Sequence, residues 1–149
     1  MKAYDNKRRL VGIIWSSLVA LYIVIVIIAA LRPEFGSDAT ARLITRLLPT
    51  LSQQSIVLMT TFVRRAIHLI GYALLAVFLF NALISTRARP DLRRTRRRFA
   101  VYAVLIALSV AAFDETLQMR FPARHGRFQD VLIDLVGIFV GVILRVRQH

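Results

Sequence analysis

Three groups of polar residues interrupt otherwise apolar stretches of this 149-residue chain, and their types could carry chemistry. Within each group the spacing is mostly three or four residues, which places the side chains on one face of a helix. In chain order the groups are Arg65, His68 and Tyr72; Asp114, Glu115 and Gln118; and Asp130 and Asp134. Together they offer a base, proton donors and a cation, which are the groups that acid–base catalysis uses.

Acid–base chemistry would give these residues distinct roles. His68 or Glu115 would serve as the general base, with Asp114 orienting it. Arg65 and Arg124 would bind a phosphate or carboxylate through paired hydrogen bonds. The motifs contain no Ser or Cys placed as a nucleophile. The reacting group would therefore be an activated water or a carboxylate.

The remaining polar side chains are predicted to bind the ligand, and they are Tyr72, Gln118, Asp130 and Asp134. A divalent metal held by His68, Glu115 and Asp130 is an alternative, although no metal-binding spacing such as His-Glu-x-x-His occurs. The sequence specifies no metal or other cofactor. A structural alternative also stays open, in which an Arg–carboxylate–His network only holds helices together.

Long apolar stretches must position these residues. The chain is 57% hydrophobic and 19% charged, which excludes a soluble enzyme with a conventional core, and it has no Cys for disulfides or thiolate chemistry. Residues 10–31 are uncharged, and about 20 apolar residues cross a bilayer as a helix. A signal peptide has a shorter apolar region, of about 7–15 residues, so we expect a retained span. Four spans are predicted, at about 10–31, 66–86, 99–119 and 128–144.

The Lys and Arg residues predict the orientation of these spans. Four lie before the first span, seven in the loop 87–98 and two at the C-terminal end, thirteen in all, whereas the other two loops hold eight. The side richer in Lys and Arg is cytoplasmic, so both termini are predicted to be cytoplasmic. The arginine-rich loop 87–98 is interpreted as a topology anchor rather than a nucleic-acid site, because it is short and lacks interleaved aromatic residues.

The stretch 47–63 is uncharged but contains Pro49, Gln53 and Gln54. We interpret it as an interfacial segment rather than a fifth span, which would break the even count of crossings. The predicted fold is therefore an all-α membrane protein, a four-transmembrane-helix bundle with an interfacial segment in the first outer loop. Residues 1–149 are predicted to form a single domain.

This topology places the three polar groups at one depth, near the outer boundary of the membrane. We expect side chains of the second, third and fourth spans to converge in one outward-facing cavity, with the first span peripheral. The residues expected to converge there are Arg65, His68, Glu115, Gln118 and Asp134. In the last span, Gly137 and Gly141 have the spacing of a helix-packing motif, and we interpret them as packing residues rather than a ligand site.

The polar groups resemble the motifs of the VanZ-like family. Residues 65–72 resemble its basic-x-x-His-x-x-x-Tyr motif, residues 114–118 its Asp-Glu-x-x-Gln motif, and residues 124–141 its closing Arg, Asp and Gly pattern. Two positions depart from the family: Asp134 stands where an Asn is common, and Gly71 where a Glu is frequent. The two departures exchange one carboxylate for another across the site.

The resemblance implies a small multi-pass protein of the bacterial cytoplasmic membrane, in a family associated with resistance to teicoplanin and related glycopeptides. The expected partner is a membrane lipid, with a lipid-linked cell-wall precursor or a lipoglycopeptide as alternatives, and no nucleic acid. The chain would bind this molecule in its polar intramembrane site and act on it by acid–base chemistry. The alternative is a non-catalytic binding, transport or structural subunit. The oligomeric state is not predicted.

Overall fold

A computed structural model describes residues 2–85, 92–120 and 128–148, and these residues form helices without any strand. The elements are α1 (Lys2–Leu31), a short 3-10 helix (Pro33–Phe35), α2 (Ser37–Leu47), α3 (Gln53–Ser85), α4 (Leu92–Gln118) and α5 (Phe128–Arg147). The all-α fold class predicted from the hydrophobic pattern is confirmed for this part of the chain.

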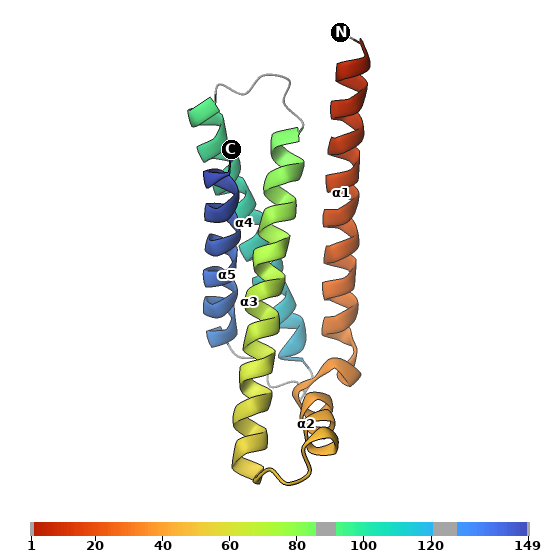
Figure 1. Ribbon diagram of the computed structural model, residues 1–149, viewed down its shortest axis with the longest axis vertical. Helices are drawn as coiled ribbons and strands as arrows, with labels where there is room; N and C mark the ends of the chain where they lie inside the picture. The colour runs from red at the N-terminus through yellow and green to blue at the C-terminus, as the bar shows by residue number, and fades with distance from the viewer. Residues whose placement is uncertain (1, 86–91, 121–127, 149) are drawn as a thin grey trace.

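The four long helices run side by side, and α3 packs against each of the other α-helices (Figure 1). The short helix α2 lies at the end of the bundle where α3 begins. The first turn of α1 and the last turn of α5 both lie toward the opposite end. The connection from α1 through α2 to α3 therefore closes one end of the bundle, and this end contains the site described below.

Within the described residues, three helices, not the predicted four, are long and apolar enough to cross a membrane. They are Asn6–Leu31, Gln53–Ser85 and Arg94–Gln118. Helix α5 has 20 residues, but Asp130, Asp134 and Arg145 interrupt its apolar sequence. Both aspartates are buried inside the bundle and so do not face its outer surface.

The helix that contains the second predicted span begins earlier than expected, at Gln53 rather than near residue 66. The Ser52 hydroxyl accepts a hydrogen bond from the Ser55 backbone N–H at 3.2 Å, as an N-cap side chain does. The uncharged stretch 47–63 therefore belongs mostly to α3, and the predicted start of this helix near residue 66 is wrong. The connection between α1 and α3 contains an amphipathic helix, α2, with Arg42 and Arg46 one turn apart and Leu43 and Leu47 exposed beside them.

Small residues bring the helices close together. Ala103, Ala107 and Ala111 form a stripe on α4 that is completely buried. On α5, a Cβ atom at Gly137 or Gly141 would collide with the backbone carbonyl of Leu69 or Ala73 on α3. The interpretation of this glycine pair as a packing motif is therefore confirmed, and it explains why α5 lies directly against α3.

Candidate functional site

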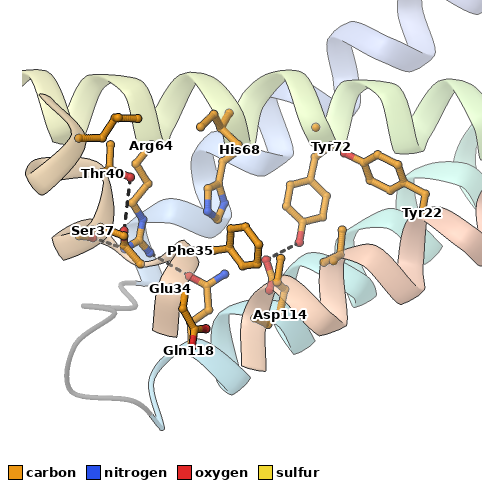
Figure 2. A pocket seen from close by; sticks show the side chains of 18 residues that line it. Tyr22, Glu34, Phe35, Ser37, Thr40, Arg64, His68, Tyr72, Asp114 and Gln118 are labelled. Carbon is orange, nitrogen blue, oxygen red and sulfur yellow. Dashed lines mark hydrogen bonds between the residues drawn. The ribbon is translucent and has the colours of Figure 1, made fainter. Parts of the chain in front are cut away.

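A cavity of about 440 Å³ opens between the C-terminal part of α1, the 3-10 helix, α2, α3 and α4 (Figure 2). One wall is mostly apolar and comes from α1, the 3-10 helix and α2. Its apolar side chains include Val26, Ala29, Ala30, Phe35 and Leu43, and its polar ones are Tyr22, Glu34, Ser37 and Thr40. The other wall is polar and comes from α3 and α4; it consists of Arg64, His68, Tyr72, Asp114 and Gln118. The volume lies within the range of about 300–1,000 Å³ typical of small-molecule sites.

Arg64 joins four helices at one edge of this cavity. Its Nη1 donates to Ser37 Oγ on α2 at 2.9 Å, and its Nη2 donates to Gln118 Oε1 on α4 at 3.0 Å. The same Nη2 lies 3.2 Å from Asp130 Oδ2 on α5. The planar, permanently charged guanidinium suits this role because it can donate in several fixed directions at once.

His68 is oriented by a carboxylate on the neighbouring helix. Its Nδ1 lies 3.0 Å from Asp134 Oδ1, and Asp134 is completely buried. The imidazole projects from α3 toward the cavity (Figure 2), so Nε2 is the ring nitrogen that a ligand would meet. A hydrogen bond from Nδ1 to a carboxylate selects the tautomer in which Nε2 accepts protons. The pair has the arrangement of a general base and its orienting acid.

Tyr72 and Asp114 form the innermost part of the polar wall. The Tyr72 hydroxyl donates to Asp114 Oδ2 at 2.9 Å, and Asp114 is only 6% exposed. Its second oxygen, Oδ1, has no hydrogen-bond partner among the described residues. Tyr22 also lines the cavity, and a Cβ atom at Gly71 would lie 2.8 Å from its hydroxyl. The missing side chain at position 71 therefore leaves room for the Tyr22 hydroxyl.

The structure brings together most, but not all, of the residues predicted from sequence. His68, Tyr72, Asp114 and Gln118 line the cavity, while Asp130 and Asp134 lie behind them as partners of Arg64 and His68. Glu115 is buried but is not part of the cavity lining.

Arg65 is exposed and lines a second cavity of about 290 Å³, between α2 and α3, to which Arg64 and Asp130 also contribute. Arg124 lies outside the described residues. The alternative metal set of His68, Glu115 and Asp130 finds no support, because no three His, Asp or Glu side chains cluster as metal ligands within the described ranges.

Two features of the site were not assigned from sequence. The first is the place of Arg64, which the sequence offered only as one of several possible partners of the carboxylates. Arg64 is one turn before His68 and two turns before Tyr72, so it shares their face more closely than Arg65 does. This regular spacing of four was the signal that could have found it. The second is the contribution of α1: it was expected to be peripheral, but Tyr22, Val26 and Ala30 line the cavity. Nothing in the apolar sequence of α1 marks these positions.

Comparison with known proteins gives a family match. The sequence model of the VanZ/LLP1 family matches residues 14–147, nearly the whole chain, and this confirms the resemblance inferred from the three motifs. No curated protein matches the chain, and no solved structure does.

Proposed function

The chain belongs to the VanZ/LLP1 family, and from this premise we propose that it is an integral membrane protein. We propose that it binds an amphiphile in the cavity lined by α1, the 3-10 helix, α2, α3 and α4. The observation that carries the proposal is that one cavity has an apolar wall and a polar wall. A molecule with a hydrocarbon tail and a polar head matches both walls. A membrane lipid, a lipid-linked envelope precursor and an amphiphilic glycopeptide all have this form.

We propose that α5 is the fourth membrane crossing, although its composition alone does not identify it as one. Asp130 lies beside Arg64 and Asp134 beside His68, so its acidic residues are paired inside the bundle. Near the other end of α5, the Arg145 Nε donates to Asn81 Oδ1 at 2.7 Å. An even number of crossings then puts both termini on one side, and the Lys and Arg distribution makes that side cytoplasmic. The cavity, at the opposite end, faces outward.

Binding is tested by filling the cavity. Ala39 lines it from α2, so Ala39→Phe would occupy the space of the ligand, whereas Thr45→Phe adds the same ring at an exposed position of the same helix. The proteins are purified in nanodiscs, and bound amphiphiles are identified by native mass spectrometry. We expect the unmodified chain and Thr45→Phe to retain an amphiphile and Ala39→Phe to lose it. If Ala39→Phe retains the same ligand, or the unmodified chain binds none, the proposal is wrong.

A second candidate function is acid–base catalysis on the bound amphiphile. The observation that favours it is the contact between His68 and the buried Asp134, which orients an imidazole into the cavity. In this role His68 Nε2 would take a proton from water or from a hydroxyl of the substrate, and Asp134 would stabilise the resulting imidazolium. Purely structural pairing would require neither an open Nε2 nor a cavity beside it.

Catalysis is tested separately from binding. The protein is incubated with polar envelope lipids, and products are followed by mass spectrometry. Removing a general base typically lowers a rate by about 10²–10⁴-fold, so we expect His68→Gln to abolish turnover while the amphiphile still binds. Arg65→Gln, which changes an exposed residue outside this cavity, is the matched control. Turnover that is unchanged in His68→Gln would refute His68 as the general base, and absence of turnover in the unmodified chain would leave binding as the function.

A further inference from the structure

We infer that the polar head of the bound amphiphile is a primary amine, held as an ammonium group by Asp114. This inference rests on the proposed function, because it names the ligand class of the same cavity. It differs from the sequence expectation, in which arginines would bind a phosphate or carboxylate. The difference comes from how the charged side chains are paired.

Asp114 is the group in the cavity that most needs a partner. It is 94% buried, and only one of its oxygens, Oδ2, accepts a hydrogen bond, from Tyr72. Within the part of the chain that the structure describes, Oδ1 has no donor. A buried carboxylate oxygen without a donor is costly, and a ligand that donates to it recovers that free energy. The ligand atom nearest Oδ1 should therefore carry a hydrogen.

The arginine in the cavity lining, Arg64, already contacts protein oxygens through its terminal nitrogens. Both terminal nitrogens of Arg64 donate to or contact protein oxygens, on Ser37, Gln118 and Asp130. It therefore presents no unoccupied pair of terminal nitrogens for a phosphate or carboxylate. His68, the other basic group in the lining, contacts Asp134 through Nδ1.

Carboxylates outnumber cations around the cavity, within the ranges described. Asp114 and Glu34 are in its lining, and Asp130 and Asp134 lie directly behind the lining residues Arg64 and His68. An anionic head would meet repulsion from Asp114 in surroundings of low polarity, where charge interactions are strong. A cationic head would balance the excess negative charge of these carboxylates.

The aromatic residues of the cavity favour the same ligand. Tyr22, Phe35 and Tyr72 all line it, and Figure 2 shows the three rings on the side of the cavity where Asp114 lies. Aromatic faces attract cations, more strongly when water is excluded. A primary ammonium also has three N–H groups, so one can donate to Asp114 Oδ1 while others reach the tyrosine hydroxyls. A quaternary ammonium carries the charge but has no hydrogen to donate.

The test uses four amphiphiles with the same tail: dodecylamine, dodecyltrimethylammonium, dodecanol and dodecyl phosphate. Each is titrated against the full chain in phosphatidylcholine nanodiscs, with empty nanodiscs as the blank, and binding is read by native mass spectrometry. A hydrogen bond to a charged group contributes about 1.5–3 kcal/mol, so we expect dodecylamine to bind about tenfold tighter, or more, than each of the other three.

Two variants locate the preference. Asp114→Asn keeps an oxygen for the Tyr72 hydroxyl but removes the charge, and it should bind dodecylamine and dodecanol with similar affinity. Asp38→Asn removes an exposed charge on α2 that lines the second cavity instead, and it should keep the preference for the amine. The melting temperature of each variant is measured alongside. If Asp114→Asn is unfolded, the amine assignment is judged from the selectivity of the unmodified chain among the four amphiphiles.

The outcomes separate this inference from the proposed function. Equal affinity for all four amphiphiles, or tightest binding of dodecyl phosphate, would overturn the amine assignment and leave amphiphile binding standing. A preference for the amine that persists in a folded Asp114→Asn variant would also overturn it, because the charge would then be recognised elsewhere. Failure of the unmodified chain to bind any amphiphile, added or co-purified, would overturn the proposed function itself.

Discussion

Replacing Gly137 by Ala should loosen the contact between α3 and α5, the contact that brings Asp134 to His68. The new Cβ would collide with the backbone carbonyl of Leu69, and a backbone atom in the middle of a helix cannot rotate away. The helix axes would have to separate. The same holds for Gly141 and the carbonyl of Ala73, one turn further along α5.

The size of the effect follows from two opposing contributions. Adding a methylene-sized group to a closely packed contact costs about 1–3 kcal/mol, and collision with backbone favours the upper value. Ala is favoured over Gly inside a helix by about 1 kcal/mol, which offsets part of this cost. The net loss is about 2 kcal/mol, or about 4–8 °C in melting temperature for a chain of this size. Because both glycines hold the same pair of helices, the double variant should lose less than twice this amount.

The assay is thermal melting of the purified protein in one detergent, with Gly12→Ala as the matched control. Gly12 lies within α1, and a Cβ there would lie 3.3 Å from the Ser85 Oγ, a side-chain atom that can move. Gly12→Ala should therefore melt at or slightly above the temperature of the unmodified chain. If Gly137→Ala and Gly12→Ala melt together, the close approach of α5 to α3 is not what stabilises the bundle.

Three further predictions concern the site and the topology. Arg64→Gln should lower the melting temperature, because removing one partner of a buried ion pair costs about 3–5 kcal/mol. Arg65→Gln, at an exposed position, should shift the melting temperature little. Equal shifts would contradict the role of Arg64 as the residue that joins four helices. Glu115→Gln should lower the melting temperature but leave amphiphile selectivity unchanged, since Glu115 is buried outside the cavity lining. A change of selectivity in the amphiphile titration would instead place Glu115 in the site. A reporter fused after His149 should read as cytoplasmic, and an external signal would refute the proposed topology.

The sequence predicted the polar wall of the site better than the apolar wall. His68, Tyr72, Asp114 and Gln118 were identified because a polar residue within an apolar helix is costly and therefore conspicuous. Their convergence followed from helical periodicity and chain direction alone. An apolar residue such as Val26 gives no such signal, because a residue that faces lipid and one that faces an apolar cavity are chemically alike.

The boundaries of helices were predicted less well, for related physical reasons. The absence of charge in residues 53–63 indicated membrane contact, but it did not distinguish an interfacial segment from the first turns of a long helix. At the other end of the bundle, Arg94 and its neighbours were assigned to a loop, although they belong to α4. The long apolar stem of an arginine lets a helix carry it at the membrane boundary while the charge reaches water, so charge alone does not end a helix there.

The acidic residues of α5 connect the topology of the chain to its site. A charged side chain at the membrane centre costs about 2.5–3.5 kcal/mol on insertion scales, so two aspartates oppose the insertion of α5 as an isolated helix. In the bundle this cost is offset because Asp130 contacts Arg64 and Asp134 contacts His68. Packing alone would be served better by apolar residues of similar size, since buried ion pairs seldom add net stability. The two pairs, one beside the arginine that joins four helices and one orienting a histidine toward the cavity, are therefore the features of α5 that the proposed ligand site would use.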